Sequence, residues 1–333
     1  MSFQLPEQIA NALDPQYLNL ILFPTENCNF RCTYCYEDFE LGKMNSDVVD
    51  GIKALIKNRV PKLKHLKISW FGGEPLAAKD IIYDISTHIA DLQKRYSHLI
   101  YTANMTTNGS LLNEVTFKKL SSLGVQFYQI SLDGDEETHN QSRINAIGKG
   151  TFNSIWKNLL CIRNYIDMDI HVMIRIHFSP ENYLKIIPLI KKINDELADD
   201  PRFSVYFKPI ERLGGASDEK IQVFANESEK YDVISLLRRH LKKATMISTL
   251  SSESDYVCYA SRANSLAIRS NGDIAKCTVA LSDERNRIGH LNKDGTVEID
   301  QALLRPWLKG LQSQDDLELA CPYSTMKTLA QAG

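Results

Sequence analysis

The feature that most constrains the fold is a series of six short runs rich in β-branched and aromatic residues within the first 210 residues. Turn-forming residues bound each run, as is typical of β-strands. Amphipathic stretches typical of helices lie between them, and one of these, residues 181–197, contains Pro188, which should kink the helix or mark its start. The expected strands are residues 17–23, 66–70, 101–107, 125–131, 170–178 and 203–208.

Strands that alternate with helices at this spacing imply βαβ crossovers and a parallel sheet. We therefore expect an α/β fold over residues 1–210, either a doubly wound sheet or a partial (β/α)6 TIM-like barrel. In both folds the functional groups lie at the carboxyl ends of the strands. Residues 211–250 carry one long helical pattern and are expected to form a helical linker. Residues 251–333 show hairpin signals, with Asn271-Gly272 as a turn, and are expected to form a small C-terminal domain.

The composition describes an ordinary globular protein. Apolar residues make up 43% of the chain, and 39 Lys plus Arg against 41 Asp plus Glu give a formal charge of -2, which argues against a nucleic-acid partner. No apolar run approaches the roughly 18 residues that cross a bilayer, and the N-terminus lacks a secretory signal. We expect a cytoplasmic protein without a membrane partner. In a reducing compartment its seven cysteines favour metal ligands, catalytic groups or buried thiols over disulfides.

Three of these cysteines, Cys28, Cys32 and Cys35, directly follow the first expected strand. Three thiolates on one loop cannot complete a tetrahedral zinc site without a fourth ligand. They can hold three irons of a [4Fe–4S] cluster and leave the fourth iron open to a small molecule. Residue chemistry therefore favours such a cluster, with a zinc site or chance burial as the alternatives.

The pattern Cys28-x3-Cys32-x-Tyr34-Cys35 resembles the signature of radical S-adenosylmethionine (SAM) enzymes, including the aromatic residue before the last cysteine. The resemblance implies a [4Fe–4S] cluster whose open iron binds the amino and carboxylate groups of SAM, with Tyr34 as part of the cofactor site. It also implies an electron donor such as flavodoxin or ferredoxin. SAM is then cleaved to a 5′-deoxyadenosyl radical, which abstracts a hydrogen from the substrate.

Two further segments at expected strand ends extend this resemblance. "WFGGEP" (70–75) resembles the Gly-Gly-Glu motif, in which Gly72 and Gly73 permit close backbone approach and Glu74 accepts a hydrogen bond from the SAM amino group. The alternative is a glycine-rich turn with a solvated glutamate. "TTNG" (106–109) adds Asn108 as a cofactor contact, with a plain Asn-Gly turn as the alternative.

The fourth expected strand ends in "SLDG" (131–134), and "THNQSR" (138–143) follows it. The resemblance implies that Ser131 and Arg143 contact the ribose and the carboxylate of SAM. An arginine suits a carboxylate because it can bind both oxygens in a fixed orientation. For Asp133 and His139, a direct role and a turn-capping or surface role are both open.

A second set of cysteines comprises Cys258, Cys277 and Cys321. The pattern C-x13-G-x4-C over residues 258–277 resembles the beginning of the SPASM or twitch extensions of radical SAM enzymes, which hold auxiliary iron–sulfur clusters. The full SPASM pattern continues with C-x2-C-x5-C-x3-C, but in this chain only Cys321 follows. The resemblance therefore implies one auxiliary cluster, and structural thiols are the alternative. Cys161, on an apolar stretch, is expected to be structural.

The resemblance to enzymes with such extensions implies a peptide or protein substrate. This substrate would receive a carbon–carbon or thioether crosslink or would be oxidised. Fewer than 30 residues precede the first cysteine motif, so leader recognition is expected to use another surface or a separate leader-binding partner. The alternatives are formylglycine formation as in anaerobic sulfatase maturases, a small-metabolite substrate, and a non-catalytic cluster scaffold. The intact motifs argue against the scaffold.

The catalytic base stays unassigned at this point. Sulfatase maturases place an acidic base after the cysteine that matches Cys277, where this chain has Thr278. Asp273, Asp283 and Glu284 are nearby candidates, and nothing in the sequence selects among them.

Overall fold

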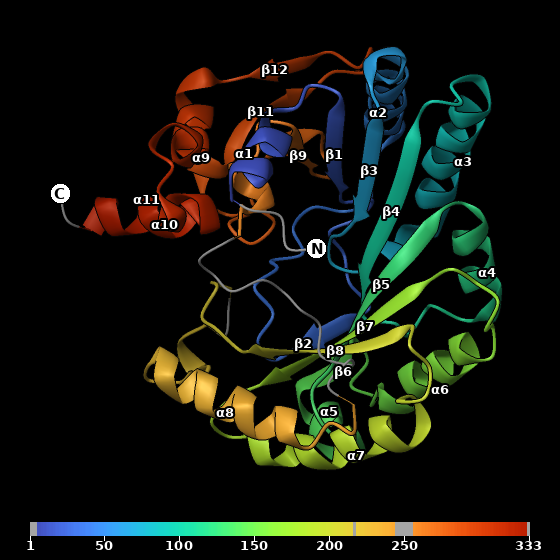
Figure 1. The fold of residues 1–333 in the computed structure, drawn as a ribbon, viewed down its shortest axis with the longest axis vertical. Helices are drawn as coiled ribbons and strands as arrows, with labels where there is room; N and C mark the ends of the chain where they lie inside the picture. The colour runs from blue at the N-terminus through green and yellow to red at the C-terminus, as the bar shows by residue number, and fades with distance from the viewer. Residues whose placement is uncertain (1–4, 216–217, 244–255, 332–333) are drawn as a thin grey trace.

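A computed structural model describes residues 5–215, 218–243 and 256–331. Six parallel strands form the main body, and each pairs with the next one along the chain among these six. They curve around a common interior (Figure 1) and confirm the expected partial barrel and all six predicted strand positions. The strands are β1 (Tyr17–Leu22), β3 (His65–Trp70), β4 (Ile100–Thr107), β5 (Val125–Leu132), β7 (His171–Phe178) and β8 (Phe203–Pro209).

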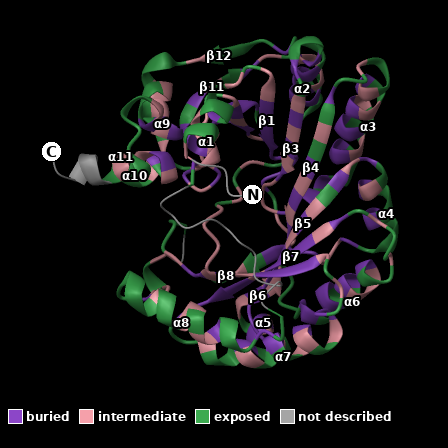
Figure 2. Cartoon of the chain, in the orientation of Figure 1, coloured by how far each residue is buried: buried purple, intermediate pink, exposed green. Residues whose placement is uncertain are grey.

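Helices cover the outer face of this sheet. Their buried residues face the strands, and their exposed residues face away from them (Figure 2). Pro188 lies in the first turn of α7, after a short 3-10 helix (Tyr183–Ile186). Of the two predictions for this residue, a kink or a helix start, the helix start is therefore confirmed. The covering helices are α2 (Ser46–Arg59), α3 (Lys79–Arg95), α4 (Glu114–Ser122), α6 (Phe152–Arg163) and α7 (Ile187–Glu196).

Alternation along the strands divides the sheet into an apolar outer face and a polar inner face. On β3, Leu66, Ile68 and Trp70 are buried, whereas Lys67 and Ser69 between them are only half-buried. Successive side chains of a strand point to opposite faces, so the half-buried polar residues face the interior of the barrel. The same alternation brings Asn104, Gln129, Arg175 and Lys208 to this interior.

The C-terminal strands continue the barrel sheet past β1. Strand β9 (Ser265–Ile268) pairs in parallel with β1 and antiparallel with β10 (Asp273–Ala275). The predicted Asn271-Gly272 turn joins β9 to β10, with Gly272 at a φ of +91°. Strands β11 (Arg287–Leu291) and β12 (Val297–Ile299) extend the sheet, which has ten strands among the described residues.

Helices complete both ends of the chain. The N-terminal α1 (Leu5–Leu13) packs on the C-terminal part, where Ala12, Val257 and Leu319 share a small core. The C-terminal helices are α9 (Gln301–Ser313), α10 (Asp316–Ala320) and α11 (Pro322–Gln331). Within the expected linker, α8 covers Glu227–Arg239, and the expected boundary at residues 250 and 251 lies outside the described residues. No helix in the described ranges is long and apolar enough to cross a membrane.

Candidate active site

The loop after β1 carries the first three cysteines to the carboxyl ends of the strands. Short strand β2 (Phe30–Cys32) pairs with β6 (Arg143–Asn145) and sets Cys32 opposite Arg143. Cys28, Cys32 and Cys35 all line one cavity. Burial raises the pKa of all three thiols, to about 12 for Cys28 and about 11 for Cys35. Since metals bind thiolates, metal binding at this loop must displace three protons.

The donor set suits a cluster better than a single ion. Among the described residues, no group of three or more His, Cys, Asp or Glu is arranged to hold one metal ion. A [4Fe–4S] cube binds its thiolates at separate corners and so needs them further apart. The backbone N–H of Phe30 reaches Cys28 Sγ at 3.3 Å, and the positive charge of Arg143 favours the thiolate forms of Cys32 and Cys35. Three thiols, a nearby cation and a backbone donor fit a cluster held by three cysteines.

The glycine pair after β3 packs directly on the segment that leads into Cys28. Gly72 has a φ of +119°, and a Cβ there would lie 2.2 Å from the carbonyl oxygen of Thr25. A Cβ on Gly73 would lie 2.5 Å from Glu26 O and 2.6 Å from Asn27 O. Close backbone approach is therefore present as expected, with the cysteine loop as the partner, and both glycines line the cavity.

Glu74 lies behind the cavity wall and is fully buried, which excludes the solvated alternative. Its carboxylate accepts hydrogen bonds from Thr107 Oγ1 (2.8 Å), Asn108 N (2.8 Å) and Leu76 N (3.0 Å). It thereby ties the end of β3 to the end of β4. Its hydrogen bond to the SAM amino group stays a prediction.

Asn108 lines the cavity beside the cysteines. Its Nδ2 donates to Asn29 Oδ1 at 2.8 Å, and its Oδ1 accepts from Ser110 N at 3.0 Å. Gly109 follows with a φ of +81°, so the expected Asn-Gly turn is also present. The turn holds the asparagine side chain against the cysteine loop.

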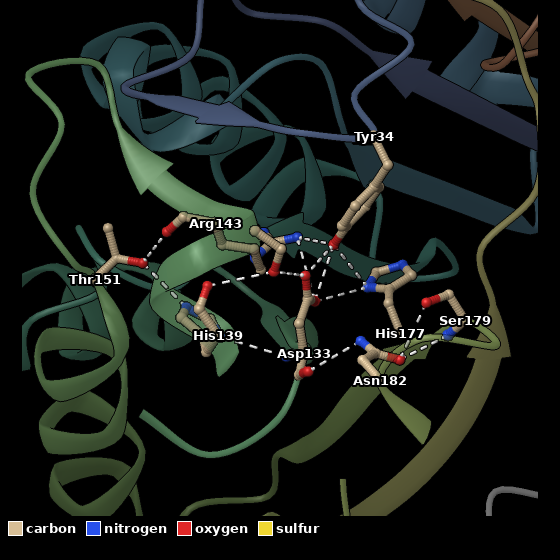
Figure 3. A network of polar contacts seen from close by, with 9 residues as sticks. Tyr34, Asp133, His139, Arg143, Thr151, His177, Ser179 and Asn182 are labelled. Carbon is tan, nitrogen blue, oxygen red and sulfur yellow. Dashed lines mark hydrogen bonds and ion pairs between the residues drawn. The ribbon is translucent and has the colours of Figure 1, made fainter. Parts of the chain in front are cut away.

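A buried polar network joins Tyr34 to the ends of β5 and β7 (Figure 3). The Tyr34 hydroxyl lies 2.8 Å from Asp133 Oδ2 and accepts from Arg143 Nη1 at 2.8 Å. Asp133 is fully buried, also accepts from Ser142 Oγ, and lies 3.4 Å from His177 Nδ1. Burial opposes its ionisation, yet Arg143 and His177 hold the pKa of Asp133 well below its usual range. The surface role considered for Asp133 is therefore wrong.

His139 supports this network from α5 (Glu136–Ser142) (Figure 3). Its Nδ1 accepts from the backbone N–H of Asp133 at 3.3 Å, and its Nε2 contacts Thr151 Oγ1 at 3.0 Å. Thr151 in turn donates to the carbonyl oxygen of Arg143. Burial lowers the pKa of His139 to about 4, so the ring is neutral at pH 7 and positions its neighbours. A surface role is excluded for this residue too.

Arg143 also lines the cavity. Its Nη1 is used by Tyr34, and Asp133 Oδ1 lies 4.0 Å from the same nitrogen. Its Nε is buried and has no partner among the described residues. Ser131 lines the same cavity. The expected SAM contacts thus lie together, and their roles stay predictions.

Several cavity residues escaped the sequence analysis: Glu37, Arg175, His177, Lys208 and Glu211. Arg175 and His177 alternate with apolar residues in the strand 171–178, and this period of two could have identified an inward polar face. Glu37 follows the cysteine motif by two positions and offered no local signal. Burial and the nearby charge of Glu26 raise its pKa to about 8.

The second set of cysteines also comes together, apart from the first cavity. The charges of Cys277 and Cys321 act on Cys258, whose pKa burial raises to about 11. The backbone N–H of Val279 reaches Cys277 Sγ at 3.4 Å. None of the three lines the first cavity. Cys161 is half-buried on α6, and its electrostatic neighbours include no other cysteine.

The candidate bases near Cys277 do not line the first cavity either. Asp273 is buried against Arg287, Asp283 pairs with Arg285, and Glu284 is exposed. Thr278 bonds to the Tyr259 hydroxyl at 2.8 Å. The structure therefore gives none of these acids a place beside the cysteine loop.

Comparison with known proteins places the chain in a family. The sequence model of the radical SAM superfamily matches residues 22–193, which is more than half of the chain. The chain therefore belongs to the radical SAM superfamily. As predicted, it therefore uses a [4Fe–4S] cluster and SAM.

Two curated relatives show how far the similarity extends. A cysteine-type anaerobic sulfatase-maturating enzyme of Clostridium novyi is 26% identical over 208 residues, 55% of this chain and 54% of that protein. A GTP 3′,8-cyclase of Clostridium perfringens is 29% identical over 181 residues, 53% of this chain and 52% of that protein. The chain thus spans about half the length of these curated relatives.

Solved structures share the fold over more of the chain. Native anSMEcpe with bound AdoMet has a TM-score of 0.62 at 17% identity. The superposition covers 86% of this chain and 80% of the anSMEcpe chain. SuiB of Streptococcus suis bound to S-adenosylmethionine has a TM-score of 0.59 at 15% identity and covers 93% of this chain and 71% of its own. At such identities the likeness establishes the fold alone.

Proposed function

We propose that this radical SAM enzyme modifies a side chain of a peptide or protein, by a carbon–carbon or thioether crosslink or by oxidation. The observation that carries the proposal is the single cavity where three cysteines meet Gly72, Gly73 and Ser131 at the carboxyl ends of the strands. The peptide substrate is supported by relatives. These include the sulfatase-maturating enzyme of C. novyi, anSMEcpe with a Kp18Cys peptide, and SuiB bound to the precursor peptide SuiA.

Within this proposal, Cys28, Cys32 and Cys35 hold the SAM-binding cluster. When bound, the cluster and SAM supply the electron and the 5′-deoxyadenosyl radical that takes a substrate hydrogen. Arg143 orients the SAM carboxylate and Ser131 contacts the ribose, and both residues line the cavity. The bonds of Tyr34 to Asp133 and Arg143 keep the loop between the second and third cysteines in place.

Cys258, Cys277 and Cys321 are proposed to hold one auxiliary cluster, with a fourth position that no cysteine occupies. The charges of Cys277 and Cys321 act on Cys258, and that of Cys321 acts on Cys277, which supports this assignment; Cys258 and Cys277 are partly buried, and Cys321 is exposed. The auxiliary cluster would take up the electron that remains after hydrogen abstraction. Peptide delivery by a separate leader-binding protein and reduction by flavodoxin or ferredoxin remain part of the proposal.

A second candidate is formylglycine formation, supported by the sulfatase-maturating relatives. Against it, Thr278 stands where that reaction would have its acidic base, and this side chain is buried against Tyr259. A small-molecule substrate is supported by the GTP 3′,8-cyclase relatives. The peptide assignment is tested by co-expression with any short peptide encoded beside this gene. A crosslink would lower its mass by two hydrogens.

Anaerobic reconstitution tests the chemistry itself. Two clusters require close to eight irons per chain, and about four would remove the auxiliary one. With reductant and SAM the protein should release 5′-deoxyadenosine, and Cys32→Ala should abolish this release. Cys161→Ala is the matched control and should retain it. Undiminished SAM cleavage by Cys32→Ala would contradict the proposed function.

A further inference from the structure

The interior wall of the barrel carries an excess of positive charge. None of the six parallel strands contains an Asp or a Glu, whereas they carry Lys67, Arg175 and Lys208 on their inner face. Lys67 has no ion-pair partner in the described ranges, and the charge that acts on it is another cation, Arg262. Walls of one charge sign concentrate ligands of the opposite sign.

Arg175 is an unneutralised cation that lines the cavity of the cysteines. It is paired in register with Ser131 on the neighbouring strand. Its Nε is buried without a partner, and the described residues offer the side chain no ion pair or hydrogen bond. Its electrostatic neighbours include Tyr36 and His177, which also line the cavity.

The other two cations of this cavity have acidic neighbours. Arg143 lies beside Asp133, and Lys208 is paired with Glu211. Arg143 acts on Cys32 and Cys35, and Arg175 acts on none of the three cysteines, so their thiolates do not neutralise it.

Glu37 is the remaining acid of the cavity, and it does not neutralise the charge of Arg175. The charges that act on Glu37 come from Glu26, Arg269 and Asp38. Arg175 is therefore left without an anion among the described residues.

Arg175 is half-buried, and its Nε is shielded from solvent. A guanidinium stays protonated in proteins, and removing part of it from water without a partner is costly. The group that satisfies Arg175 is therefore an anion that enters with a ligand, and a planar carboxylate matches its paired donors. We propose that Arg175 binds a carboxylate of the substrate beside the SAM site. The substrate would then be an acidic peptide, held by a glutamate or aspartate side chain or by its C-terminal carboxylate. This inference rests on the proposed function.

Three probe peptides and the reconstituted holoenzyme with SAM test the inference. They are Ac-Ala-Ala-Glu-Ala-NH2, its glutamine isostere, and Ac-Ala-Ala-Ala-Ala with a free C-terminal carboxylate. Calorimetry should show at least one carboxylate peptide binding about tenfold or more tighter than the glutamine peptide. The carboxylate peptide that binds more tightly identifies the source of the anion. Equal binding of all three peptides would overturn the inference. SAM cleavage would be unaffected by that result, so a failure of the inference can be told apart from a failure of the proposed function.

Variants at position 175 separate a substrate contact from a SAM contact. Arg175→Met should lose the carboxylate preference, Arg175→Lys should keep part of it, and both should bind SAM within about twofold of the parent. Arg287→Met, at an exposed position, is the control and should change neither affinity. A tenfold loss of SAM affinity in Arg175→Met would assign Arg175 to the SAM carboxylate and overturn the inference. Retained preference in that variant would do the same.

Discussion

Among single residues, Gly73 packs so closely on the segment before Cys28 that a side chain there has no room. An added Cβ would meet backbone atoms of Glu26 and Asn27 between 2.5 and 2.7 Å away, and backbone cannot rotate aside as a side chain can. We expect Gly73→Ala to displace the segment before Cys28 and to lower the free energy of unfolding by about 1–3 kcal/mol. Anaerobic urea unfolding and iron content per chain measure both effects.

Gly42 provides the control for this substitution. The nearest atom to a Cβ there, Asn27 Nδ2, is 3.8 Å away, and its backbone is not in the left-handed region. Gly42→Ala should therefore change stability by no more than about 0.5 kcal/mol. If both variants unfolded alike and bound the same iron, the close packing of Gly73 would not matter to the loop.

Asp133 carries the negative charge that makes a buried Arg143 tolerable. Asp133→Asn keeps the size of the side chain but leaves the guanidinium without its neighbouring anion. Removing one partner of a buried pair costs about 3–5 kcal/mol, and we expect a loss of this size in urea unfolding. Asp135→Asn, at the N-cap of α5, is the control, because asparagine caps a helix about as well as aspartate. Equal losses in the two variants would contradict the assignment.

At the level of elements, the connection from β5 through α5 depends on a neutral histidine. The Nδ1 of His139 accepts a hydrogen bond from the backbone N–H of Asp133, so a proton on Nδ1 would set two donors against each other. The folded pKa of about 4 lies below the ordinary histidine value of about 6.5. Between these pH values the unfolded chain binds a proton that the folded chain does not, so stability falls as the pH falls.

Urea unfolding across this pH window tests the prediction. Lowering the pH from 7 to 4 should cost up to roughly 3 kcal/mol through His139. His139→Asn should reduce the steepness of this fall, whereas His240→Asn at an exposed position controls for the removal of a histidine. An unchanged slope in His139→Asn would show that another group titrates.

The elements themselves were largely predictable from local patterns. Runs such as residues 170–178 combine β-branched and aromatic residues, and they became strands at the expected places. Pro188 and Asn271-Gly272 act through their own backbone geometry, so their effects could be read without knowledge of the rest of the chain. The order of parallel strands follows from the βαβ rhythm.

What could not be predicted depends on contacts between distant segments. Asn19 of β1 bonds to Ser265 of β9 across 246 positions, and no local pattern specifies that pairing. "SLDG" has the composition of an exposed turn, yet Asp133 is fully buried because Tyr34, Ser142 and Arg143 reach it from other segments. The alternation along residues 171–178 could have placed Arg175 on the inner face, but its position beside the three cysteines depends on contacts that no local pattern specifies.

At the level of the whole molecule, the C-terminal strands brace the loop that carries the first cysteines. Glu26, two residues before Cys28, is fully buried and accepts hydrogen bonds from Arg269 Nε and Ser270 N, both at 3.2 Å. Arg269 and Ser270 directly follow β9, which itself pairs with β1. The two cysteine sets are thus mechanically connected through one sheet and one buried ion pair.

Arg269→Met tests this connection at a distance from the cysteine ligands. The substitution leaves the Glu26 carboxylate buried without its cation, which costs about 3–5 kcal/mol when a buried pair is broken. Because Glu26 belongs to the segment that packs on Gly73, we expect the Cys28 loop to loosen and the SAM-binding cluster to be lost preferentially. Iron content and the electron paramagnetic resonance signal that SAM shifts would report this loss.

Arg287→Met is the matched control, because Arg287 pairs with Asp273 at 3.1 Å but is 70% exposed. Asp273 is buried, but it keeps the hydrogen bond from Asn271 Nδ2 and the contact with His290. An ion pair whose cation lies in solvent contributes about 0–1 kcal/mol, so this variant should keep its stability and its cluster signals. A loss confined to the auxiliary cluster in Arg269→Met would mean that the ion pair serves only the C-terminal strands. Loss of the SAM-responsive signal, with Arg287→Met unchanged, would instead show that the C-terminal segment maintains the geometry in which the first three cysteines bind their cluster.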